Sequence, residues 1–430
     1  MKLSTWRGIA TTSALLTLSY SAYATVNITG ANQIQNSVGT AVQTLCTTTN
    51  RAGITNGSNE DLLLQACDQI VPEYNANLGD AGALTDAQAL EALQDIAAEE
   101  VAAIASGFTD TAQDQMASVG SRLEFLRTGI ASGLAMNWGG DTGGAAGADF
   151  SKLSFFFNGD YGFGDKDGTS AENGFDFDAF GFTAGADYRI NDELIAGAAL
   201  SYSEAEVDFD NNKGETDSDG FTLSLYGSYY LGDFYFDAVL GFGQMDYEGE
   251  RNVVITPLNI NEKPKSDTDA DVITWSLGGG YTLAQDAWSH NFFARLDSID
   301  ADIDGYTETN SFLALTVNDQ DVESLQAVIG GQSSWTLSSS KGVFVPYAGL
   351  EWHFEFDDDD RTVSSVYRFD TTSSAFQFAS DDADDNFGVL SVGTNIVISQ
   401  GRQLFINYDR VVELDDVTAG TLTAGARFEL

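Results

Sequence analysis

Segments in which apolar and polar residues alternate follow one another from about residue 151 to the terminal Leu430. Gly220–Glu250 is representative. Its odd-numbered positions include the apolar residues Phe221, Leu223, Leu225 and Leu231, and its even-numbered positions include the polar residues Thr222, Ser224 and Ser228. Successive side chains of a β-strand point to opposite faces, so each segment has one apolar and one polar face. The short gap at Leu231–Asp233 indicates a tight hairpin turn. The pattern predicts an all-β transmembrane barrel of the outer-membrane type.

About twelve antiparallel strands are expected, an even number as in single-chain bacterial barrels. They are placed near residues 151–163, 175–190, 193–209, 217–231, 233–249, 269–285, 288–300, 320–337, 342–357, 383–399, 402–413 and 418–430. The gaps between them alternate between tight and long, as short inner turns and longer outer loops would require. A soluble β-sandwich fits less well, because its strands usually have about 5–6 residues.

The N-terminus has the pattern of a secretory signal peptide, residues 1–24. Lys2 and Arg7 supply the positive region, and Ala22-Tyr23-Ala24 is a small-residue cleavage site. The mature chain is therefore expected to start near Thr25. No run of about 18 apolar residues occurs in the sequence, so no transmembrane helix is expected.

The chain carries 65 Asp and Glu residues against 19 Lys and Arg, for a formal net charge of −46. So acidic a surface repels phosphate backbones, and nucleic acid is not expected as a partner. The acidic residues lie largely in loop-like segments around the ends of the predicted strands, and we interpret them as a solvated surface: 208–219, 357–360 and 381–385. The alternative is that they collect divalent cations, because Ca²⁺ prefers carboxylate oxygen. Asp357, Asp358, Asp359 and Asp360 are weak candidates that lack the D-x-D-x-D-G spacing of a calcium loop, and no metal site is assigned.

Cys46 and Cys67 are the two cysteines of the chain, and both precede the predicted barrel. In an exported chain an isolated pair most simply forms one disulfide. It would close a loop of about 20 residues and contribute about 3 kcal/mol in the chain-entropy model. A metal site would need further ligands, and His290 and His353 fall within the barrel. We therefore predict a disulfide.

Helical patterns precede the barrel. A short helix is expected after Ser58, a longer one from a cap at Thr85 to Gly107, and a third from Thr111 to about Ile130. The glycine-rich segment 137–150 is typical of a flexible connector. The predicted division is a signal peptide at 1–24, a small helical passenger with one disulfide at 25–110, a linker helix and connector at 111–150, and the barrel at 151–430.

Two segments resemble the first hairpins of the autotransporter (type V secretion) β-domain: GFDFDAFGFTAGADYRINDELIAGAALSYSEAEVDFD, Gly174–Asp210, and TLSLYGSYYLGDFYFDAVLGFGQMDYEGER, Thr222–Arg251. The resemblance covers about 280 residues. It implies an exported N-terminal passenger, a helical linker that threads the barrel, and a twelve-strand translocator. The implied location is the outer membrane of a Gram-negative bacterium.

The same resemblance implies roles for individual residues. Arg122 and Arg127 of the linker would face the lumen, with Asp187 and Glu429 as acidic partners. Phe428 and Leu430 would form the C-terminal assembly signal, although the family usually ends in Phe or Trp. The implied partners are outer-membrane lipids, lipopolysaccharide, the barrel assembly machinery and periplasmic chaperones, and the implied state is a monomer without a cofactor.

The predicted function is that of a translocator barrel which inserts its own short passenger into or across the outer membrane. No catalytic residues are predicted, because residues 25–110 contain no histidine and no G-x-S-x-G elbow. Two alternatives remain open. One is a plugged barrel without secreted cargo, and the other is a small adhesin or binding module displayed at the surface.

Overall fold

The structure is a computed structural model that describes residues 30–70, 84–98, 100–101, 119–120, 122–123, 152–169, 173–340, 342–357, 362–379, 384–398 and 402–429. The predicted signal peptide, the connector 137–150, Arg127, Asp358–Asp360 and Leu430 lie outside the described residues.

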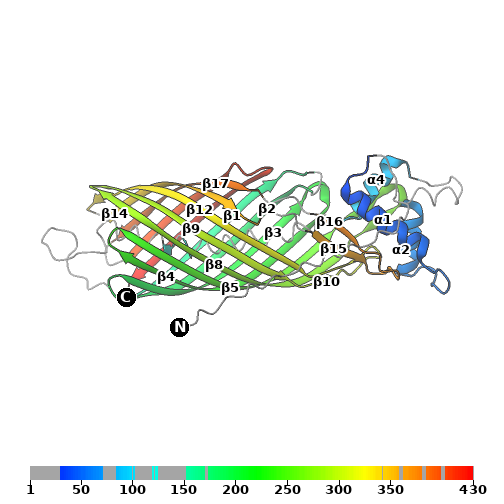
Figure 1. The fold of residues 1–430 in the computed structure, drawn as a ribbon, viewed down its shortest axis with the longest axis horizontal. Coiled ribbons are helices and arrows are strands. Elements are labelled where there is room, and N and C mark those ends of the chain that lie inside the picture. The colour runs from blue at the N-terminus through cyan, green and yellow to red at the C-terminus, as the bar shows by residue number, and fades with distance from the viewer. Residues whose placement is uncertain are drawn as a thin grey trace, which may run out of the picture.

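Twelve long antiparallel strands form a closed barrel (Figure 1). They are β1 (Leu153–Lys166), β2 (Phe175–Arg189), β3 (Leu194–Phe209), β4 (Gly214–Leu231), β5 (Phe234–Arg251), β8 (Lys265–Gln285), β9 (Trp288–Ile303), β12 (Gln320–Trp335), β14 (Gly342–Glu355), β17 (Asn386–Ile398), β18 (Arg402–Val412) and β19 (Val417–Glu429). Each strand pairs with its neighbour in this order, and β12 pairs directly with β14. The predicted fold class and strand number are confirmed.

The first and last strands close the ring. β1 pairs with β19 along nearly its whole length, from Ser154 opposite Glu429 to Lys166 opposite Val417. Phe157 and Phe428 stack across this seam with ring centroids 5.9 Å apart. Because every strand has two neighbours, the barrel has no free edge and its backbone groups are paired within the sheet.

The two faces of the barrel wall differ as the alternation predicts. On β4, Phe221, Leu223 and Leu225 are about half exposed, whereas Thr222, Ser224 and Ser228 are buried inside. Similar large apolar side chains stand on the outside of the other barrel strands, for example Phe182, Phe236, Leu277, Phe292, Ile329, Leu350, Leu390 and Ile406. This apolar belt is the lipid-facing surface of a membrane barrel.

The polarity of the wall inverts toward one end of the barrel. On β8 the outward residues change from Asp267, Asp269 and Asp271 to Ile273 and Leu277. Beyond the belt the inward residues become apolar instead: Met245, Tyr247, Ala270, Val272, Ile299, Ala301, Ile303 and Val322. The inversion marks where the wall leaves hydrocarbon and becomes the shell of a water-exposed domain with an internal core.

The structure corrects the interpretation of 208–219 as a loop-like segment, because β4 begins at Gly214 and the connection expected at 210–216 is shorter. The segment is strand apart from a short turn containing η1 (Asp210–Asn212), and its acidic strand side chains stand on the outer wall. Carboxylates lie directly opposite one another across neighbouring strands: Asp178, Glu206, Asp217, Glu248 and Asp267 form one row. Like charges so placed repel, so the row belongs in water and outside the membrane.

The two ends of the barrel carry different connections. At one end they are tight, as at Gly232, whose positive φ of 62° suits a residue without a Cβ. The connections at the other end hold further short elements: β6 (Val253–Ile255), η2 (Thr256–Leu258), β7 (Ile260–Glu262), β10 (Tyr306–Thr307), β11 (Leu315–Val317), β15 (Thr362–Tyr367) and β16 (Phe376–Ala379). β10, β11, β15 and β16 form a small sheet of their own. β13 (Leu337–Ser339) lies in the tight connection between β12 and β14.

A helical module lies beyond the long-loop end of the barrel (Figure 1). Its described part comprises α1 (Gln33–Thr48), α2 (Asn59–Ile70) and α4 (Asp86–Asp95), followed by residues 96–98 and 100–101. α1 lies in a stretch without a strong helical signal in the sequence, and α4 is shorter than predicted. The helix α4 ends at Asp95, and Ala98, three residues further on, has a φ of 61°. Within the described residues, no helix is long and apolar enough to cross a membrane.

A charge in the centre of the apolar belt should be costly. Leu225→Lys places an ammonium group in hydrocarbon and is expected to destabilise the barrel by about 2–4 kcal/mol. Asp217→Lys, on the same face of the same strand but above the belt, should change stability by less than about 1 kcal/mol. Urea unfolding of the two variants in lipid vesicles measures the difference, and equal losses would contradict the assigned membrane boundary.

Candidate functional site: the barrel lumen and its outer mouth

A short helical segment of the chain lies inside the barrel. Val119 and Leu123 pack against inward side chains of the tight-turn half: Phe156, Ile195, Ala199, Tyr226 and Val239. Arg122, on the same segment, is 2% exposed and forms an ion pair with Asp187 of β2. Its Nε donates to Asp187 Oδ2 at 3.0 Å. Part of the predicted linker therefore occupies the lumen.

Asp187 is held from a second side. Ser154 Oγ donates to Asp187 Oδ1 at 2.9 Å, and Arg427 Nη2 donates to Ser154 Oγ at 2.9 Å. Asp187 is one of the two acidic partners expected for the linker arginines. The other expected partner is Glu429, whose side chain lies outside the described part of the structure, as does Arg127.

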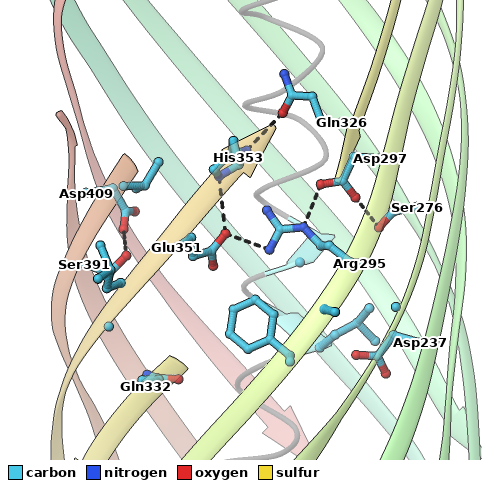
Figure 2. Close-up of a pocket in the computed structure, with 18 of the residues that line it drawn as sticks. Asp237, Ser276, Arg295, Asp297, Gln326, Gln332, Glu351, His353, Ser391 and Asp409 are labelled. Atoms are coloured by element: carbon cyan, nitrogen blue, oxygen red, sulfur yellow. Dashed lines mark hydrogen bonds and ion pairs between the residues drawn. The ribbon is translucent and has the colours of Figure 1, made fainter. Parts of the chain in front are cut away.

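A cavity of about 300 Å³ remains in the lumen beside this segment. Figure 2 shows Arg295 between Asp297 and Glu351, below His353 and Gln326. Arg295 Nε lies 2.6 Å from Asp297 Oδ2, and Arg295 Nη1 lies 2.7 Å from Glu351 Oε2. Arg295 is thus paired with two carboxylates of the wall. Among the described residues that line the cavity, His353 contacts Gln326 and Glu351 and no hydrogen bond joins it to a serine, as a nucleophile–base pair would require.

The outer mouth of the barrel is filled by a hydrophobic cluster. It joins apolar side chains of the three described helices to the inward side chains beyond the belt and to residues of the outer loops, including Tyr306, Leu315, Val363, Tyr367 and Phe376. Tyr367 is 2% exposed, and its hydroxyl donates to the Ile96 carbonyl at 3.0 Å. Gln377 N donates to Ser37 Oγ of α1 at 3.0 Å. The module and the mouth thus share one core.

Ionic contacts accompany this core. Lys213, which follows η1, pairs with Asp95 at the end of α4. Arg251, the last residue of β5, binds Glu308 through two hydrogen bonds of 2.7 Å, from Nε to Oε1 and from Nη2 to Oε2. Glu100 of the module is buried beside this pair and accepts a hydrogen bond from Asn173 at 3.3 Å.

Burial dominates the electrostatics of the two module carboxyls. It raises the pKa of Glu100, against the lowering effect of the Arg251 charge. It also raises the pKa of Asp95, against the hydrogen bond from Lys213. Desolvation is thus only partly offset, and removal of either cation would leave a buried carboxylate uncompensated.

Sequence reasoning did not single out these five residues, Lys213, Arg251, Glu308, Asp95 and Glu100. A signal was nevertheless present, because only 19 basic residues occur in the chain and Lys213 and Arg251 interrupt strongly acidic stretches. Their partners are distant in sequence, and the fold brings them together.

The helical module contains one disulfide. Cys46 of α1 and Cys67 of α2 are joined, with Cα atoms 5.9 Å apart and both side chains buried. Asp68 lies close enough to these sulfurs to suggest a metal group. However, its carboxylate forms two 2.6 Å contacts with Arg51, so it is already paired. Of the weak metal candidates in the loop, Asp357 alone is described, and it lies just beyond the end of β14.

The fold and this threaded lumen define a class: an outer-membrane β-barrel that encloses a segment of its own chain. A family model of the autotransporter β-domain matches residues 155–409. The chain belongs to this family, as the resemblance of its first hairpins implied. It is an autotransporter translocator, located in the outer membrane of Gram-negative bacteria, and this barrel fold is not itself catalytic.

Similarities to known proteins support this assignment. The translocator domain of the autotransporter NalP from Neisseria meningitidis has a similar fold, with a TM-score of 0.55 and 14% identity over 75% of this chain and 99% of that one. Esterase EstA from Pseudomonas aeruginosa is 28% identical over 200 residues, which are 45% of this chain and 30% of that protein. Lipase 1 from Photorhabdus luminescens is 23% identical over 241 residues, 53% of this chain and 35% of that protein. The chain thus matches about a third of the length of these two curated relatives.

The buried pair in the lumen gives a testable consequence. Arg122→Met leaves the Asp187 carboxylate buried without its guanidinium and should cost about 3–5 kcal/mol. The double variant Arg122→Met/Asp187→Leu removes both charges and should recover most of that loss. Thermal unfolding of the purified proteins in detergent measures both, and a double variant no more stable than the single one would contradict the ion pair.

Proposed function

We propose that this autotransporter delivers its helical passenger, residues 25–110, to the outer face of the membrane and keeps it there as a cap on the barrel. The observation that carries the proposal is the shared core, in which the helices and the outer mouth bury the same apolar surface. A passenger built for release would need a core complete in itself.

The size of the module supports retention. The three helices that the structure describes here bury little apolar surface on their own, and domains of this size are marginally stable without further constraints. The disulfide between α1 and α2 supplies one constraint, worth about 3 kcal/mol. Docking on Tyr367, Phe376 and their neighbours supplies the rest of the core. The barrel thus completes the folding of the domain that it exports.

The passenger is further proposed to have no catalytic activity. The names of two relatives, an esterase and a lipase, raise the opposite possibility. However, residues 25–110 lack a histidine and a G-x-S-x-G elbow, which an acyl-transfer triad of that type would use. Membership of the family also supports insertion by the barrel assembly machinery with the help of periplasmic chaperones.

Display at the surface can be tested with epitope tags. A tag inserted after Asn56, in the exposed connection between α1 and α2, should bind antibody on intact cells and stay in the cell fraction. The control tag, inserted after Gly232 in a tight turn, should bind only after permeabilisation, since tight turns face the periplasm. A tag after Asn56 that is inaccessible, or that appears in the medium, would refute the displayed and retained cap.

If the passenger is not catalytic, the protein should not hydrolyse esters. Purified full-length protein should hydrolyse short-chain p-nitrophenyl esters no faster than the heat-denatured sample, because no triad is available. A fluorophosphonate probe should likewise leave its serines unlabelled. Turnover that is abolished by heating, together with labelling of one serine, would establish an enzymatic passenger instead.

A further inference from the structure

Basic residues are few, and several of the 19 stand on the connections and strand ends at the outer end of the barrel. Among them are Lys213, Arg251, Lys263, Lys265 and Arg368. Lys263 and Lys265 both pair with Glu250 on the barrel itself. Arg368 donates to the Glu308 carbonyl at 2.9 Å. Lys213 differs because it forms an ion pair with Asp95 of the module, and Arg251 differs because it is buried near Glu100 of the module.

The barrel fixes the Arg251 side chain and the Lys213 backbone through contacts of its own. Glu308 is fixed by the two hydrogen bonds from Arg251 and a third from Leu315 N at 2.8 Å. The backbone at Lys213 is tied to the end of β5 through Asn252 N, which donates to the Lys213 carbonyl at 2.6 Å. The Arg251 guanidinium is therefore anchored at the end of β5, and the Lys213 backbone is anchored just after the η1 turn.

One hydrogen-bond donor of Arg251, the Nη1 group, is not used within the described part of the barrel. Its side chain is buried, and Nη1 has no hydrogen-bond partner in the part of the chain that the structure describes. A buried guanidinium N–H without a partner is costly unless a nearby negative charge compensates it. Glu100 is the module carboxylate whose charge acts on Arg251, and it is itself 8% exposed.

The module supplies matching charges. Arg51 is its single basic residue between 30 and 101, so its composition is strongly acidic. Asp95 and Glu100 are five residues apart, at the end of α4 and just beyond it. Asp95 forms an ion pair with Lys213, and Glu100 is buried in the field of the Arg251 charge. The outer wall nearby carries instead the row of carboxylates from Asp178 to Asp267, which would repel them.

We propose that Lys213 and Arg251 form a two-point receptor on the barrel rim that captures Asp95 and Glu100 and so positions the passenger over the outer mouth. The proposal rests on the proposed retention of the passenger and names the residues that direct it. Burial of apolar surface supplies the docking free energy. The two cations select one docking position for the acidic passenger, because the carboxylates elsewhere on the rim repel it. They are positioning residues.

Charge reversal in the full-length protein tests the receptor. Spin labels are placed at exposed sites, one at Thr47 of α1 and one at Thr307 of β10, by an unnatural amino acid that leaves Cys46 and Cys67 bonded. Double electron–electron resonance should give one narrow distance distribution in the unaltered protein. Lys213→Asp, Asp95→Lys and Glu100→Lys should each broaden it. The swap Lys213→Asp/Asp95→Lys should restore the narrow distribution.

Lys263→Asp is the matched control, since Lys263 stands on the same rim but pairs with Glu250 of the barrel. Heat-modifiable migration shows that each barrel has folded. Single reversals that keep the narrow distribution, or a swap that does not restore it, would overturn the receptor. A broad distribution in the unaltered protein would instead overturn the docked cap itself.

Discussion

Hydrocarbon offers no hydrogen-bond partners, and this constraint determines the whole barrel. Every backbone N–H and C=O within the membrane must be paired inside the protein, which for β-structure requires a closed ring. Here β1 and β19 meet at one seam and β12 and β14 pair directly. A closed ring of twelve strands has an interior, and that interior is wide enough for a segment of the chain with Arg122 on it. The threaded lumen and the module beyond it depend on this closure.

Most of the barrel is predictable because membrane strands obey a simple rule. Their outward side chains must be apolar over the thickness of the bilayer, so the alternation in Gly220–Glu250 indicates both the strands and their faces. The rule applies only within the bilayer. Beyond it, the acidic residues of 208–219 suggest a solvated connection, whereas most of that segment continues the strands β3 and β4. The alternation persists there with acidic side chains on the outside.

The helical module and its docking position on the barrel are harder to predict, for a different reason. α1 is rich in Thr, Gln and Asn, and several of these residues have weak helix propensity, so the helix depends on packing against β16 and the other helices. The contacts of Lys213 with Asp95, and of Arg251 with Glu308, join residues far apart in the chain. A single sequence carries no direct signal for such pairs. By contrast, Asp187 is a foreseeable partner for Arg122, because it is an inward acidic residue on a strand whose faces the alternation assigns.

The shared core at the outer mouth has a consequence for the evolution of such a chain. Apolar side chains such as Tyr247, Val272 and Ile303 line a mouth that is covered by helices of the same polypeptide. With the helices retained as we propose, a foreign cargo fused in their place would leave these apolar side chains uncovered. Helices and barrel must therefore change together, and a substitution on one side selects for a matching substitution on the other.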